Sequence, residues 1–451
     1  MRAANTTWVR ALVIGAGVLA LAGCETVSDF NPFSEKEKIL PGERQPLYTG
    51  ADPLDEVAGA TSVSPGGQSD RGSWTQSGGN AANYSGHVAL GGGGGARTWK
   101  VQAGAGGGSG FGSITGESLR VTARPVAYGG NAYVYDPRGK VTAVSLGGGR
   151  RWTVNVRPEG EENDNAAGGG VAADNGRVFV STAYGEVIAL DAGSGQKVWT
   201  AKLHGPARTA PSAADGKVFV ATQNNEIYAL NQSDGSELWT YRGIAENAGL
   251  LQTASPAVSS GIVVVPSTSG EIVALSTSSG DFRWSDMVSR SFRTEAVSGL
   301  ADVSASPVIA DGVVYAAGVG GRTIAVNLKS GSRLWEEGVG SMHTPVVSGE
   351  AVFMVDIENR AVALSRKTGK PLWVTELPRG EKKKRNIWAG PVLAGGALWF
   401  VSNRGDMIAI NASNGTAISS RKIGSSAYVS PIAVSGQILV LFGDGALAAY
   451  R

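Results

Sequence analysis

Cysteine and histidine are scarce in this chain. Its 451 residues include one cysteine, Cys24, and three histidines, His87, His204 and His343. One cysteine cannot form a disulfide within the chain, and the histidines lack the close spacing of a metal-binding motif. The sequence therefore predicts no metal site, and stability has to come from packing rather than from cross-links.

An excess of charge of either sign is also absent. The chain has 40 Lys and Arg against 38 Asp and Glu, a net charge of +2, which leaves no electrostatic footprint for nucleic acid. No G-x-S-x-G motif marks a nucleophile at a strand-to-helix turn. Residues 104–110, GAGGGSG, lack the Lys-Ser/Thr pair and the following helix of a phosphate-binding loop. We predict no catalytic residue, no cofactor and no nucleic-acid partner.

The chain is rich in one repeated unit that ends in tryptophan. The stretch VIALDAGSGQKVWT begins at Val187, and its frame is an alanine, an apolar residue, a five-residue stretch ending in glycine, three residues and a tryptophan. A glycine in the same turn position of every copy indicates a backbone with positive φ. These glycines are Gly149, Gly195, Gly235, Gly280, Gly331, Gly369 and Gly415. A degenerate copy carries Ser419 in the tryptophan position. The tryptophans in this position are Trp99, Trp152, Trp199, Trp239, Trp284, Trp335 and Trp373.

Each unit contains four short β-branched segments separated by glycine turns, with no helical periodicity. This pattern is typical of a propeller blade, whereas a sandwich or a parallel β-helix does not predict a tryptophan at the end of every fourth strand. Seven full units span residues 123–423, and an eighth stops at Arg451 after three strands. The upstream segment ARTWKVQ supplies the missing strand. We predict an all-β, eight-bladed β-propeller with four-stranded antiparallel blades, its ring closed by an N-terminal strand.

The seven tryptophans are best explained as blade-docking residues. An indole has enough area to cover a neighbouring sheet, and its N–H can bond a backbone carbonyl. The alternative, a wall on which a ligand stacks, requires one or two such residues rather than one in nearly every blade. We therefore predict a structural role for all of them.

The first 24 residues resemble a bacterial lipoprotein signal. Arg2 and Arg10 precede a short apolar run that ends in LAGC, the pattern in which the cysteine is acylated. The alternative is an incidental cysteine in an ordinary signal peptide. We predict a signal peptide over residues 1–23, lipidation of Cys24, a flexible tether over 24–70 and the propeller over 71–451. Glu25, rather than aspartate, favours the outer membrane.

The repeat A-x-(D/N)-x-x-(T/S)-G-x-x-x-W resembles that of the pyrroloquinoline-quinone propeller family and covers most of residues 97–451. Quinoprotein dehydrogenases of that family typically use an adjacent cysteine pair, which this chain lacks. The lipoprotein signal, the tether, the eight units and SWTQSGGNAAN at Ser73–Asn83 resemble the BamB family, the propeller lipoproteins of the outer-membrane β-barrel assembly machinery.

The BamB resemblance implies a non-enzymatic scaffold. Such a protein is a monomer within a hetero-complex, on the periplasmic face of the outer membrane. It binds the POTRA domains of the central barrel protein, BamA, contacts other components of the complex, and acts on nascent outer-membrane proteins. The rival functions are a quinone-dependent dehydrogenase and a propeller that binds cell-wall polysaccharide.

The resemblance also implies the partner contacts. Aligned on Pro256 and Pro307, the family's apolar contacts fall on Leu250 and Leu251, and an acidic contact falls on Asp302. A basic residue and a second acidic residue of the family pattern are missing here. Independently, these segments are where the repeat spacing lengthens, and long loops on a rigid scaffold often carry binding. The alternative is that the leucines pack beneath their own loop.

Two charged segments interrupt the repeat. Residues 159–164 are acidic and residues 381–385 are basic. Either segment is explained by a solvated loop, and the basic one also by a contact with an acidic partner or with phospholipid headgroups.

Overall fold

The computed structural model describes residues 52–55, 57, 61–106, 121, 123–161, 168–243, 254–288, 303, 305–381 and 384–451. These residues all lie in the second of the chain's two compact units, which begins at Gly50. The predicted signal peptide, Cys24 and the tether up to residue 51 lie outside them. In this part of the chain, no helix is long and apolar enough to cross a membrane.

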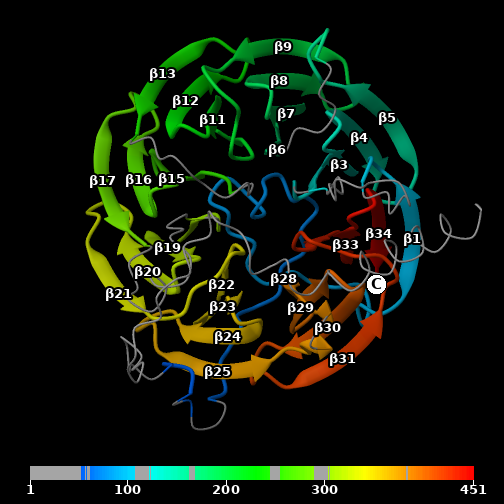
Figure 1. The fold of residues 1–451 in the computed structure, drawn as a ribbon, viewed down its shortest axis with the longest axis vertical. Helices are drawn as coiled ribbons and strands as arrows, with labels where there is room; N and C mark the ends of the chain where they lie inside the picture. Colours follow the sequence, from blue (N-terminus) through cyan, green and yellow to red (C-terminus); the bar gives the residue numbers. More distant parts are fainter. Residues whose placement is uncertain are drawn as a thin grey trace, which may run out of the picture. The chain divides into compact units, whose positions relative to one another are not determined.

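The described residues form eight four-stranded antiparallel blades around a common centre (Figure 1), plus one two-stranded hairpin. From the innermost strand outward, blade one is β2 (Val126–Tyr128), β3 (Asn131–Tyr135), β4 (Lys140–Ser145) and β5 (Arg150–Asn155), and blade two is β6 (Gly169–Asp174), β7 (Arg177–Thr182), β8 (Glu186–Asp191) and β9 (Lys197–Lys202). Blade three is β10 (Ser212–Ala214), β11 (Lys217–Ala221), β12 (Glu226–Asn231) and β13 (Glu237–Arg242), and blade four is β14 (Ala257–Ser259), β15 (Ile262–Pro266), β16 (Glu271–Ser276) and β17 (Phe282–Met287). Blade five is β18 (Val308–Ala310), β19 (Val313–Gly318), β20 (Arg322–Asn327) and β21 (Arg333–Glu337), and blade six is β22 (Val346–Ser348), β23 (Ala351–Val355), β24 (Arg360–Ser365) and β25 (Pro371–Glu376). Blade seven is β28 (Trp388–Ala394), β29 (Ala397–Ser402), β30 (Asp406–Asn411) and β31 (Ala417–Lys422), and blade eight is β32 (Ile432–Val434), β33 (Gln437–Leu441), β34 (Ala446–Tyr450) and β1 (Arg97–Gln102). The hairpin is β26 (Gly380–Glu381) with β27 (Lys384–Arg385).

The alanine and the tryptophan of the repeated frame lie opposite each other across one blade. In blade three, Phe219 pairs with Ala229, which pairs with Trp239. The small alanine leaves room for the two rings, whose centroids lie 5.9 Å apart. Blade seven exchanges the positions, with a tryptophan on its second strand and Ser419 on its fourth. The sequence repeat is therefore a packing repeat, with the core between neighbouring blades.

Each tryptophan of the repeat bonds to the following blade. The Nε1–H of Trp199 donates to the carbonyl of Gln232 at 3.0 Å, and a Cβ on Gly235 would lie 2.5 Å from the same indole. The turn glycine is thus required by a φ of +77° and by the indole above it. The other indoles donate to equivalent carbonyls: Trp99 to Leu146, Trp152 to Ala192, Trp239 to Thr277, Trp284 to Leu328, Trp335 to Arg366 and Trp373 to Ala412.

The glycine assignment is wrong in blade one. The frame predicts positive φ at Gly149, but Gly148 has it, with φ of +92°. The reason is a turn that is shorter by one residue. Here Ser145 N–H donates to the carbonyl of Gly149, whereas in blade two Asp191 N–H donates to Gln196, five residues on.

Two N-terminal segments pair with strands of the blades. Strand β1 pairs antiparallel with β34 and forms the outer strand of blade eight, with Trp99 opposite Ala449. Residues 71–91, here named the axial segment, run inside the ring (Figure 1). This segment bonds the inner strands or their turns in blades one, two, three, four, five, seven and eight. The axial segment thereby supplies hydrogen-bond partners to backbone N–H and C=O groups at the inner edges of these blades.

The described residues between 52 and 70, which belong to the predicted tether, include side chains that pack on the propeller. Leu54 and Val63 are each only 4% exposed, packed against blades five to seven. The Asp52 carboxylate accepts from Arg360 Nη2 at 2.9 Å, and Arg360 also bonds Asp356. Leu54 and Val63 are isolated apolar residues in a polar stretch, so they give no periodic signal. Their burial nevertheless holds this segment against the propeller.

Candidate functional site

Two long connections leave the ring on the same face. One joins β13 to β14 and the other joins β17 to β18. Because each blade has four antiparallel strands, both connections leave from the end of an outer strand and return at the start of the next inner strand. Leu250, Leu251 and Asp302 belong to these connections and lie outside the described residues. The structure does describe the residues that hold the connections at both ends.

The outer end of the first connection is held by polar contacts within blade three. Gly243 N–H donates to the carbonyl of Asn225 at 3.0 Å. Arg242 lies 3.3 Å from the Glu226 carboxylate, which also accepts from the hydroxyl of Tyr228 at 2.8 Å. The arginine is largely exposed, so the ion pair contributes little stability by itself. The pair does place two charged side chains next to Gly243, where the first connection begins.

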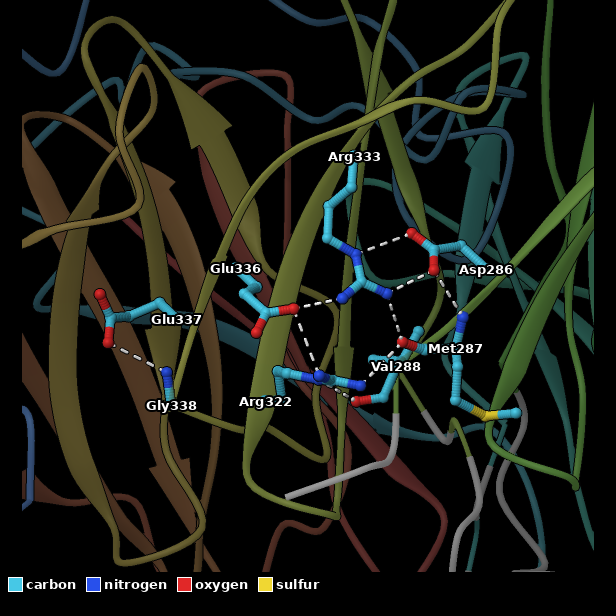
Figure 2. Close-up of polar contacts among 8 residues, drawn as sticks. All are labelled: Asp286, Met287, Val288, Arg322, Arg333, Glu336, Glu337 and Gly338. Atoms are coloured by element: carbon cyan, nitrogen blue, oxygen red, sulfur yellow. Dashed lines mark hydrogen bonds and ion pairs between the residues drawn. The ribbon is translucent and has the colours of Figure 1, made fainter. Parts of the chain in front are cut away.

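The outer end of the second connection is held by two arginines of blade five (Figure 2). Arg322 donates from Nε to the carbonyl of Val288 at 3.1 Å and from Nη2 to that of Met287 at 3.0 Å. Arg333 grips the Asp286 carboxylate with two nitrogens, and this hydrogen bonding raises the pKa of Arg333. Glu336 accepts from both arginines. The end of β17 is therefore fixed to the neighbouring blade.

The inner ends of the two connections meet. Ser255 N–H donates to the hydroxyl of Ser306 at 2.8 Å. Between them, Asn83 of the axial segment donates from Nδ2 to the carbonyls of Ser255, Pro256 and Pro307 at 3.1, 3.2 and 3.1 Å. The structure thus brings together the ends of the two segments that carry the predicted contact residues.

A small cleft lies between blades three and four, at the foot of the first connection. Its volume is about 100 Å³. Its lining includes the buried apolar side chains of Ile227, Val265 and Val273 together with the charged residues Arg242 and Glu271. A lining of apolar and charged side chains suits contact with a protein surface more than acid–base chemistry.

The histidines have structural surroundings. His87 Nδ1 lies 2.9 Å from the carbonyl of Gly66, and its Nε2 accepts from Gly396 N–H at 2.8 Å. His204 bonds the hydroxyl of Tyr228. Burial, with a smaller contribution from Arg124, lowers the pKa of His343 to about 4. No group of three or more His, Cys, Asp or Glu side chains suited to a metal ion occurs among the described residues.

The charged segments are described in part. In the acidic segment, Glu159 and Glu161 are described. The basic segment is a hairpin rather than a plain loop, since Glu381 pairs with Lys384 across β26 and β27. Lys382 and Lys383 lie outside the described residues.

The sequence analysis does not identify Arg322, Arg333 or Asn83 as functional residues. A signal for Arg322 exists in the repeat. The first residue of the third strand is glutamate in blades two, three and four, at Glu186, Glu226 and Glu271. It is arginine in blades five and six, at Arg322 and Arg360, and lysine in blade one, at Lys140. The change from glutamate to arginine at this position is the sequence signal for the contact of Arg322 with the end of β17.

Comparisons with known proteins agree with this architecture. The model of the family described as outer membrane protein assembly factor BamB matches residues 137–375 and 358–451. The BamB of Salmonella typhimurium is 29% identical over 330 residues, 72% of this chain and 83% of that protein. The BamB of Escherichia coli K12 is 28% identical over 352 residues, 77% and 86% of the two chains.

Solved structures show the same fold. The crystal structure of BamB from Moraxella catarrhalis has a TM-score of 0.66 at 20% identity, covering 79% of this chain and 99% of the other. Quinohemoprotein alcohol dehydrogenase from Comamonas testosteroni has a TM-score of 0.63 at 15% identity, covering 84% and 80%. The predicted family and the eight-bladed all-β fold are confirmed. Enzymes share this fold, so the fold alone does not decide the function.

Proposed function

The chain belongs to the family of the outer membrane protein assembly factor BamB, and from this premise we propose that it is a non-enzymatic scaffold of outer-membrane protein assembly. It would assist the folding and insertion of β-barrel proteins as a monomer within a hetero-complex. The observation that carries this proposal is the match of the family model to residues 137–375 and 358–451. Fold likeness to dehydrogenases, at 15% identity, carries no comparable weight for activity.

The partner we propose is the POTRA region of the central barrel protein, bound by the face that carries the two long connections. Leu251 precedes Ser255 by four residues, and Asp302 precedes Ser306 by four. Four residues reach at most about 14 Å. Since Ser255 and Ser306 are hydrogen-bonded, the points from which the leucine pair and the carboxylate are attached lie side by side. Apolar anchors beside a carboxylate suit a sheet edge or a helix of the partner.

Affinity purification tests this function in its natural setting. Full-length chain with a C-terminal tag, isolated from detergent-solubilised membranes, is expected to bring the central barrel protein with it in near-equal amount. An unrelated tagged lipoprotein, purified in parallel, controls for co-extraction. If the barrel protein is no more abundant with this chain than with the control, the proposed scaffold role is wrong.

We also propose that the chain has no enzymatic activity. Mixing the purified protein with pyrroloquinoline quinone and Ca²⁺ separates this from the dehydrogenase alternative. Stoichiometric uptake of the quinone together with dye-linked alcohol oxidation would contradict the proposal.

We propose that Cys24 anchors the protein to the outer membrane, on its periplasmic face, after removal of residues 1–23. Residues 24–51 would then form the tether, since Asp52 is the first residue for which the structure describes a contact with the propeller. Acyl chains bind a bilayer stably when two or more are attached.

The variant Cys24→Ser is expected to move the protein from the membrane to the soluble periplasmic fraction, or to leave it unprocessed. Labelled fatty acid should enter the wild type and not the variant. A variant that still sediments with the outer membrane after a high-salt wash, beside an unlabelled wild type, would rule out the anchor.

A further inference from the structure

We propose that Asn83 is a positioning residue for the partner-binding face. It holds the inner ends of both long connections in one arrangement, so that their contact residues meet the partner together. This inference rests on the proposed function and adds a residue that lies at the centre of the ring, away from any partner.

The side chain of Asn83 is buried, and both its oxygen and its nitrogen form hydrogen bonds. It is 1% exposed. Its Oδ1 accepts from Gly78 N–H at 3.2 Å and from the hydroxyl of Ser255 at 3.0 Å. Its Nδ2 serves the carbonyls at Pro256 and Pro307 as well as that of Ser255. The two Nδ2 hydrogens serve three carbonyls, so one hydrogen is shared, and both acceptor sites of Oδ1 are occupied.

The backbone conformation of Asn83 also favours asparagine at this position. Its φ is +54°, a left-handed conformation that asparagine tolerates better than most residues. A Cβ on Gly78 would lie 2.5 Å from the Cβ of Asn83, so only glycine fits beside it. Local geometry thus directs the amide at the junction of two blades.

The residues just before Asn83 bond the same two blades. The carbonyl of Ala81 accepts from Val258 N–H at 2.7 Å, in β14 of blade four. The carbonyl of Ala82 accepts from Ile309 N–H at 2.9 Å, in β18 of blade five. Three consecutive residues therefore fix the spacing of the two inner strands into which the long connections lead.

Loss of the amide has a local consequence. The carbonyls of Ser255, Pro256 and Pro307 would lose a buried donor, which favours local opening over global unfolding. A connection whose inner end is free must be ordered when the partner binds, and that entropy cost lowers affinity. The effect should therefore appear at the connections and in binding, even though Asn83 touches neither partner nor solvent.

The matched control is Gln76, another amide of the axial segment that is 1% exposed. Its Nε2 donates to the carbonyl of Ala213 at 2.9 Å, and its Oε1 accepts from Ala213 N–H at 3.2 Å. Ala213 lies in blade three, whose inner strand follows neither long connection. Gln76→Ala removes a comparable buried amide without touching the junction of blades four and five.

The experiment compares full-length Asn83→Gly, which keeps the positive φ, with Gln76→Ala and the wild type. Hydrogen exchange at Ser255 is expected to speed about tenfold in Asn83→Gly, while Gln76→Ala affects Ala213 instead. Affinity for the isolated POTRA region should fall about five- to tenfold in Asn83→Gly and stay within about twofold in Gln76→Ala. Asn83→Asp, which keeps the acceptor and loses the donor, should behave like Asn83→Gly.

Unchanged exchange at Ser255 in Asn83→Gly would overturn the proposal, as would equal loss of affinity in Gln76→Ala. If Asn83→Asp does not fold, Asn83→Gly decides alone. If the wild type fails to bind the POTRA region, the proposed function is wrong, whereas the exchange measurement still decides whether Asn83 holds the connection.

Discussion

A chain that lacks residues 25–105 is expected to lose its cooperative thermal melt and to aggregate. This deletion removes strand β1, which pairs with β34, and the axial segment, which bonds seven of the described blades. On the order of ten hydrogen bonds are lost, at about 1 kcal/mol each. That sum is comparable with the roughly 5–15 kcal/mol that stabilises a typical domain. The exposed edges of β34 and of the inner strands would then be free to pair with other chains.

Two shorter deletions control this result. Removing residues 25–51 should leave the melt unchanged, because the described contacts of the N-terminal segment begin at Asp52. Removing residues 25–70 should lower the melting temperature without abolishing the transition, since Leu54 and Val63 are buried while the axial segment remains. Equal melting curves for the deletions ending at 51 and at 105 would show that the ring does not depend on these segments.

The double variant Leu250→Ala/Leu251→Ala is expected to weaken binding to the POTRA region by about 2–4 kcal/mol, because buried apolar anchors dominate such interfaces. Adding Asp302→Arg should weaken it further, and this additional loss should shrink as salt is raised. Affinity is measured by titration, and folding by the melting temperature, which should barely change.

Leu238 and Leu334 provide matched controls. They are leucines on the outer strands β13 and β21, 45% and 54% exposed. Changing both to alanine should leave affinity unaltered. Full binding by the Leu250/Leu251 variant would remove these residues from the interface. Lost binding with a collapsed melting temperature would show instead that the leucines pack beneath their own connection.

The fold was predictable because its information is local and repeated. The repeated frame predicts that Ala189 pairs with Trp199 on the neighbouring strand and that the turn at Gly235 needs glycine. The exception at Gly149 shows the limit of such reasoning. The turn of blade one is shorter by one residue, so counting forward from Ala143 gives Gly149, whereas counting back from Trp152 gives Gly148, which has the positive φ.

The contacts that hold the candidate site could not be predicted, because they join distant parts of the chain. Asn83 and Ser255 are separated by 172 positions, and no periodicity connects them. Arg322 left a weak trace as a reversed charge in the repeat. The contact residues themselves came from the family resemblance, since the connections that carry them follow no repeat that could set their conformation.

The most direct test of this account is a calorimetric titration of the full-length wild-type chain, in detergent, with the isolated POTRA region of the central barrel protein. The account predicts saturable binding of one POTRA region per chain, with a Kd of about 10 μM or tighter, equivalent to roughly 7 kcal/mol. Absence of binding at about 100 μM, with both proteins folded, would contradict it.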